Sequence, residues 1–274
     1  MMPLLTITGW ELRIGLRNRW VVATTLVLAA LALSLVLLGS APTGTVGASP
    51  ITVVVVSLAS LTIFLVPLIA LLLSFDAIVG EAERGTLLLL LAYPVARWQL
   101  VLGKFLGHVL MLALATVLGY GAAAVVLYVG EGADAGAWPA FALLIGTSVL
   151  LGAVFVALGS LVSIIVRERA TAAGVAVALW LVLVLLYDAA LLGLLVADQG
   201  QNISAGSLDL LLLMNPADIY RLINLTAHEA TAAASAMSAP IEAGLPLWSL
   251  YAALIMWIVL PLGAAVALFK RRQA

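Results

Sequence analysis

The ionisable and nucleophilic side chains of this chain are few, and their spacing excludes the familiar catalytic and metal-binding arrangements. The sequence has no cysteine and two histidines, His108 and His228, so thiolate metal sites are excluded and a metal cage is not expected. Lys104 follows a glycine but precedes Phe105, where a phosphate-binding loop requires Ser or Thr. Metalloprotease and serine-hydrolase motifs are also missing. We expect no catalytic residue, no metal and no cofactor on this chain.

Asp188 is the main ionisable residue inside an apolar run. Such a residue is a functional candidate by default, because a charge in the bilayer is costly. Counted from Thr171 at 1.5 Å per residue, Asp188 lies ~25 Å along a helix, near its outer end. An interfacial role and a role in lining a transport path both remain open. Lys104 and His108, one helical turn apart, are expected to extend to the water interface.

A short leucine-rich segment follows the second apolar run. Gly85 should break the preceding helix, Thr86 can cap a new one, and Pro94 should stop it. A helix over residues 86–93 is therefore predicted. Its consecutive leucines need a cover, and either a groove in a separate motor ATPase or the lipid surface would provide one.

The segment over residues 198–246 carries a second distinctive pattern. Asn215 can cap a helix, Pro216 suits its first position and Asp218 lies in its first turn, with Arg221 on the polar face. Two short amphipathic helices on the membrane surface fit this pattern. Resting on lipid, docking a partner protein and gating an exit remain alternatives.

The elements that must position these residues are transmembrane helices. Of the residues, 65% are hydrophobic and 9% are charged, against about 25% charged in soluble domains. Helices are the expected form, because lipid leaves no other way to satisfy the backbone. We predict an all-α integral membrane protein with one domain over residues 1–274. Its six spans are expected near residues 20–39, 52–75, 100–129, 139–166, 171–197 and 247–269.

The basic residues predict the orientation of the spans. With the N-terminus inside, every lysine and arginine except Arg221 falls on the inner side. Both termini are therefore expected in the cytoplasm. Ahead of the first span, Thr8 and Glu11 match a capping box of an interfacial helix, although a simple basic flank is an equal alternative. The Gly159/Ser163 spacing favours close packing within the fold over a dimer face.

Several strings resemble a known family. Glu81-x-Glu83-Arg84-Gly85-Thr86-Leu87, with the later Pro94, Arg97 and Gly103-Lys104, is similar to the cytoplasmic signature of type-2 ABC exporter permeases. The segments at residues 16–20, 58–61, 67–73, 75–81 and 215–225 resemble the permeases of nitrous oxide reductase maturation transporters. The resemblance covers nearly the whole chain and keeps the order of six spans.

The resemblance implies a type-2 exporter permease fold in a bacterial inner membrane. It implies a homodimer, two cytoplasmic ATPase subunits that bind ATP and magnesium, and a periplasmic accessory protein; it implies no nucleic acid. The chain itself would not be an enzyme. Its cargo would be a sulfur-containing species for the copper–sulfur centre of nitrous oxide reductase.

The resemblance also assigns roles to residues of both distinctive segments. The residues expected to couple to the ATPase are Glu81, Glu83, Arg84, Gly85, Thr86, Leu87, Leu88, Leu89, Leu90, Leu91, Pro94 and Arg97. Those expected at a periplasmic partner or gate are Asn215, Pro216, Asp218 and Arg221. Asp188 is a candidate for the transport path because of its position inside an apolar run, and the resemblance does not assign that role.

Other functions remain as alternatives. The chain could be an exporter permease for a lipid, a drug or an ion, or a membrane assembly factor that moves no cargo. A secondary transporter or channel should show inverted repeats and broken helices with charges at the midplane, and the sequence shows neither.

Overall fold

The chain is helical wherever its structure is described. The computed structural model describes residues 2–17, 19–39, 50–131, 137–199, 204–226 and 245–271. Within these ranges the elements are all helices and none is a strand. The predicted all-α class is confirmed.

The long helices fall close to the predicted spans. They are α2 (Arg19–Gly39), α3 (Pro50–Ser74), α6 (Arg97–Glu131), α7 (Ala137–Ile165) and α13 (Leu247–Arg271). The fifth span consists of α8 (Arg169–Leu181), a π-helical turn η1 (Val182–Leu186) and α9 (Tyr187–Asp198). Among the described residues, five helices are long and apolar enough to cross a membrane. The pair α1 and α2, bent by 69° at the junction, passes the same test together and makes a sixth span when counted as one.

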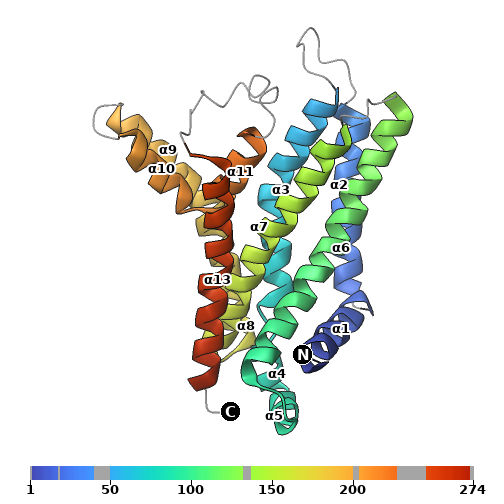
Figure 1. Ribbon diagram of the computed structural model, residues 1–274, viewed down its shortest axis with the longest axis vertical. Helices are drawn as coiled ribbons and strands as arrows, with labels where there is room; N and C mark the ends of the chain where they lie inside the picture. Colours follow the sequence, from blue (N-terminus) through green and yellow to red (C-terminus); the bar gives the residue numbers. More distant parts are fainter. Residues whose placement is uncertain are drawn as a thin grey trace.

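The short helices lie at the two ends of the bundle (Figure 1). The helices α1 (Met2–Arg17), α4 (Val79–Glu83) and α5 (Thr86–Ala92) gather at one end, with the last turn of α13. We call this the α5 end. The helix α11 (Pro216–Thr226) lies at the opposite, α11 end. The start of α1 and the end of α13 share the α5 end, as an even number of spans requires.

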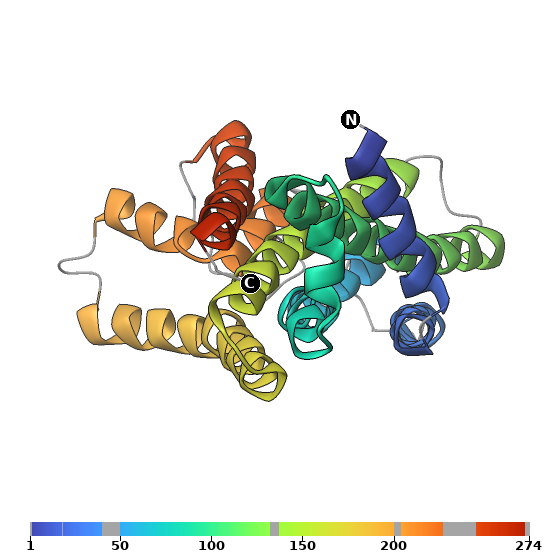
Figure 2. The same cartoon turned by 90° about the horizontal axis from the view of Figure 1, so that it is seen from below.

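Two features stand out when the bundle is seen from its α5 end (Figure 2). The helix α1 crosses α6 instead of continuing the direction of α2. The helices α9 and α10 (Ala205–Leu213) both extend away from the bundle on the same side, with a gap between them in this view.

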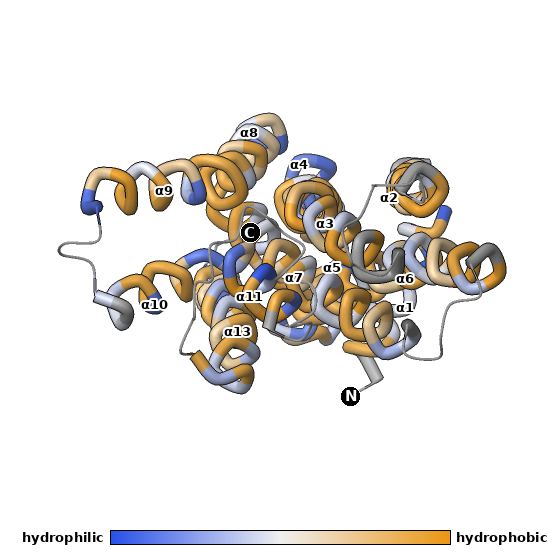
Figure 3. The backbone as a smooth tube through the Cα atoms, turned by 90° about the horizontal axis from the view of Figure 1, so that it is seen from above, coloured by the Kyte–Doolittle hydropathy of each residue, from blue (hydrophilic) through white to orange (hydrophobic). Residues whose placement is uncertain are grey.

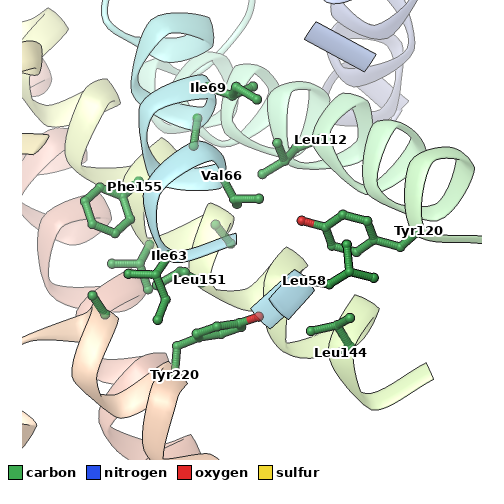
Figure 4. Packing of buried hydrophobic residues seen from close by; sticks show 14 of the residues in the cluster. Leu58, Ile63, Val66, Ile69, Leu112, Tyr120, Leu144, Leu151, Phe155 and Tyr220 are labelled. Atoms are coloured by element: carbon green, nitrogen blue, oxygen red, sulfur yellow. The ribbon is translucent and has the colours of Figure 1, made fainter. Parts of the chain in front are cut away.

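The core lies where α3, α6 and α7 meet (Figure 4). Leu58 and Val66 of α3 pack there with Leu112 of α6 and Phe155 of α7. Close approach depends on small residues, because lipid supplies no hydrophobic driving force between helices. A Cβ added at Gly159 would lie 2.0 Å from Ser74 Oγ. The expectation of in-fold packing at this small-residue pattern is therefore confirmed.

The helix α1 forms differently from its predicted start. It begins at Met2, so Thr8 lies inside the helix and caps nothing. The Thr8 hydroxyl donates to Leu4 O at 3.0 Å and lies 3.3 Å from Gly103 O of α6. The predicted capping box is wrong, because the residues before Thr8 are themselves helical.

The contact between Gly159 and Ser74 predicts a loss of stability for Gly159→Ala. The new methyl group forces Ser74 and α3 to shift, and overpacking of this kind costs about 1–3 kcal/mol. Gly146→Ala on the same helix is the matched control, because nothing lies within 4 Å of its Cβ position. Thermal unfolding in detergent should show a lower midpoint for Gly159→Ala alone. Equal midpoints for the two variants would contradict this packing.

Candidate functional site

The helix α5 begins at a glycine turn. Gly85 has φ 72°, in the left-handed region that favours glycine. Thr86 is the first helical residue and not the cap, so that part of the expectation is wrong. Its hydroxyl contacts the Glu81 carboxylate and lies 3.2 Å from the Glu81 carbonyl. The helix ends at Ala92, one residue before the predicted end.

The leucines of α5 divide into an anchored set and an exposed pair. Leu87 is buried, and Leu90 and Leu91 pack beside it against the ends of α1, α6 and α13. Leu88 is 60% exposed and Leu89 is 67% exposed. We call this pair the α5 leucine face. Only these two of the predicted leucines need a cover.

Charged residues near α5 hold the ends of neighbouring helices. Glu83 Oε1 accepts from the backbone N–H of Arg169 at 2.6 Å, where a carboxylate suits the start of α8. Arg97 Nη1 donates to the carbonyls of Phe269 and Lys270 at 2.9 and 3.0 Å, at the end of α13. Glu83 therefore connects α4 to α8, and Arg97 connects α6 to α13, at the α5 end. Arg84 lies 3.6 Å from Glu81 and is largely exposed.

Lys104 and His108 do not extend to water, so that expectation is wrong. Lys104 is 4% exposed, and its Nζ lies 3.0 Å from Glu11 Oε2 and 3.5 Å from Glu81 Oε1. His108 Nε2 lies 3.4 Å from Glu11 Oε1. Sequence reasoning placed Glu11 in a capping box and missed its ion pairs with Lys104 and His108, because these partners come close only once α1 lies across α6. Gly103 and Gly107, four residues apart, were the available signal for that crossing.

The polar residues at the α11 end form one cluster. Arg221 Nη1 lies 2.6 Å from Asp218 Oδ1, and Arg221 Nη2 lies 2.6 Å from Asp188 Oδ2 on α9. Asn215 Nδ2 donates to Asp218 Oδ2 at 3.1 Å, and Asn215 Oδ1 accepts from the N–H of Ala217. Pro216 occupies the first position of α11, as predicted. We call Asn215, Asp218, Arg221 and Asp188 the α11 cluster. The sequence had suggested two separate sites.

The helix α11 does not rest on lipid. Ile219, Tyr220 and Ile223 are fully buried, and Asn224 Nδ2 donates to Thr147 Oγ1 of α7 at 3.2 Å. Figure 3 shows hydrophilic segments of α11 among the ends of largely hydrophobic helices. The lipid-surface expectation is wrong for α11, because an amphipathic pattern does not distinguish lipid from a protein groove. Residues 200–203 and 227–244 of the predicted segment lie outside the described residues.

Neither the α11 cluster nor the cluster of Glu11, Glu81, Lys104 and His108 near α5 has the ligand set of a metal centre. In the described part of the chain, no three His, Asp or Glu side chains gather where they could hold a metal ion. The two carboxylates of the α11 cluster are bridged by Arg221, and those near α5 by Lys104. Both clusters are therefore ion-pair networks that join helices.

Burial raises the pKa of Asp218 to about 6, although Arg221 opposes the shift, and the nearby Asp188 charge raises it further. Asp218 is 2% exposed, so its charged form has lost nearly all contact with water. The carboxyl can thus change charge at a mildly acidic pH.

Comparison with known proteins identifies the class to which this architecture belongs. A family model described as "ABC-2 family transporter protein" matches residues 5–274. The chain belongs to this family of ABC transporter permeases. With its several apolar helices, it is a multi-pass protein of the inner membrane.

Two relatives narrow the comparison within the family. A protein of Pseudomonas aeruginosa named "Probable ABC transporter permease protein NosY" is 49% identical over 271 residues, 97% of this chain and 98% of the relative. A protein of Stutzerimonas stutzeri with the same name is 46% identical over 266 residues, 96% of each chain. These identities confirm the resemblance to ABC transporter permeases of the NosY kind. The relatives are named as permeases, in keeping with a membrane subunit that is not an enzyme.

The raised pKa of Asp218 predicts how stability depends on pH. The folded carboxyl binds its proton more tightly than the unfolded chain does, so stability increases as the pH falls through about 6. The gain is complete below the unfolded pKa, near 4. Asp218→Asn should remove this contribution, because the amide does not titrate. We expect the unfolding midpoint of the unchanged protein to rise relative to Asp218→Asn by a few degrees between pH 7.5 and 5.5. Parallel pH profiles for the two proteins would contradict the assignment.

Proposed function

We propose that two copies of this chain form the membrane part of an ATP-driven transporter and that separate ATPase subunits bind the α5 leucine face. The exposure of Leu88 and Leu89 carries this proposal. Two large exposed apolar side chains in the middle of a short, anchored helix favour a protein cover. Leu87 and the residues around it hold the helix firmly enough to transmit force.

Energy for transport comes from the partner subunits. The chain lacks a phosphate-binding loop, so ATP and magnesium bind on the ATPase subunits. The distribution of basic residues supports a cytoplasmic α5 end, with both termini inside. The α11 end then faces the periplasm.

The fifth span supports a homodimer. In the most apolar 18-residue stretch of this span, 11% is buried against the rest of the chain, whereas 67% is buried in the corresponding stretch of α7. The two halves of this span expose large apolar side chains, among them Val182 and Leu192. A second copy of the chain would cover part of this surface, and lipid the remainder.

The cargo is a sulfur-containing species used to mature the copper–sulfur centre of nitrous oxide reductase. Similarity to two proteins named NosY over nearly the full chain supports this part of the proposal. The α11 cluster would then act as a periplasmic gate or as a docking site for an accessory protein. Its ion pair between Asp188 and Arg221 joins the fifth span to α11, which is the geometry a gate requires.

Replacing Leu88 and Leu89 together with Asp should reduce ATPase binding. A buried leucine contributes about 1.5–3 kcal/mol, so recovery of the ATPase with the purified chain should fall by about tenfold or more. Leu210→Asp, an equally exposed leucine of α10, is the control and should leave recovery unchanged. The amount of chain in the membrane should stay constant in both variants. Unchanged ATPase recovery with the double variant would refute binding at this face.

Deleting the gene tests the assignment of cargo. We expect nitrous oxide reductase to be made but to lack its copper–sulfur centre, because the sulfur supply is interrupted. Optical spectra and activity of the purified reductase measure this. The unchanged gene should restore the centre, whereas the Leu88→Asp/Leu89→Asp gene should not. A fully active reductase in the deletion strain would exclude this cargo while leaving the ATPase interaction intact.

A further inference from the structure

A single ammonium group lies between three elements at the α5 end. Lys104 of α6 is within 3.0 Å of Glu11 of α1 and within 3.5 Å of Glu81 of α4. The Lys104 side chain is 5% exposed, and the two carboxylate side chains are 13% and 14% exposed. Water screens such contacts poorly, so the pairs resist separation.

Glu81 connects the Lys104 ammonium to α5. Its carboxylate contacts the hydroxyl of Thr86, the first residue of α5, as well as Lys104. Glu81 therefore sits between the start of α5 on one side and α6 on the other. Among the ion pairs of the described residues, this is the one that joins the α4–α5 segment to α6.

The helices α1 and α6 are in turn held together by close packing. A Cβ added at Gly103 would lie 2.6 Å from Ile7 Cγ2, and one at Gly107 would lie 2.7 Å from Glu11 Cβ. Helices in such contact move together, because packed interiors deform little. A displacement of α6 is therefore also a displacement of α1.

We propose that the Glu81–Lys104 ion pair is the main polar link through which movement of α5 reaches α6 and α1, beside the apolar packing of Leu87 with Leu100 of α6, and that Lys104 is its positioning residue. The inference rests on the proposed function, because it requires ATPase subunits that move α5. It adds the route within the permease. Glu11 holds Lys104 in place through its own ion pair but is not itself in the route.

The test uses two isosteric variants with the same change in charge. Glu81→Gln removes the link and leaves Lys104 paired with Glu11. Glu11→Gln leaves the link and the glycine packing of α1 against α6. The chain has no native cysteine, so Leu5→Cys on α1 and Ile165→Cys at the end of α7 accept spin labels selectively. Both positions are exposed. The label-to-label distance is measured in the assembled complex with and without ATP, using ATPase subunits that lack reactive cysteines.

We expect ATP to shift this distance in the otherwise unchanged complex and in Glu11→Gln. In Glu81→Gln the shift should fall to less than half. A full shift in Glu81→Gln would overturn the proposal, as would an equal loss in both variants, which would indicate general weakening around Lys104. No shift in the unchanged complex would overturn it as well. Recovery of the ATPase with the chain, measured separately, decides whether the proposed function fails too.

A charge-preserving comparison covers the case in which Glu81→Gln does not assemble. Glu81→Asp shortens one side of the pair by a methylene, and Lys104→Arg lengthens the other. The ATP-induced shift should decrease in Glu81→Asp and recover in the double variant. A decrease that persists in the double variant would reject the ion pair as the link.

Discussion

A polar group that is buried in an apolar helix bundle needs a hydrogen-bond partner inside that bundle, and this requirement constrains how the helices are arranged. Thr62 of α3 and Tyr120 of α6 meet at 2.7 Å within the core. Ser163 of α7 accepts the N–H groups of Ile78 and Val79, which would otherwise be orphaned at the start of α4. Each such contact joins helices that are distant in sequence. These polar contacts therefore help to specify which helices are neighbours, together with the apolar packing and the close glycine contacts.

The same constraint gives the two ends of the bundle different characters. At the α5 end, carboxylates and basic groups are combined with a packed apolar anchor beneath α5. At the α11 end, a guanidinium joins two carboxylates on different helices, and one of them is almost completely buried. The first arrangement combines buried apolar packing with ion pairs between three helices. The second contains the Asp218 carboxyl, which can take up a proton, so the strength of its ion pair with Arg221 depends on pH.

Much of the fold followed from composition, and much of the site did not. The long apolar runs predicted the spans, because lipid requires about 20 apolar residues per helix. Gly85 and Pro94 likewise predicted where α5 begins and ends, to within one residue. Glu11 and Lys104, in contrast, are 93 residues apart, and nothing local indicates that they meet. Every member of the α11 cluster was recognised individually, but the contact of Asp188 with Arg221 depends on how α9 and α11 pack. Thr86 was misassigned as a cap because Gly85 could itself occupy that position.

The π-helical turn Val182–Leu186 ends two residues before Asp188. A π turn holds one more residue than an α turn, so it rotates everything beyond it about the helix axis. Were this turn to rewind as ordinary α-helix, the following residues would turn by about 100°, the angle that one residue occupies in an α-helix. Asp188 would then point away from Arg221, and the guanidinium would be left with Asp218 alone. The helix type of these five apolar residues thus determines the direction in which the Asp188 carboxylate points, although their side chains have no polar group that could bond to it.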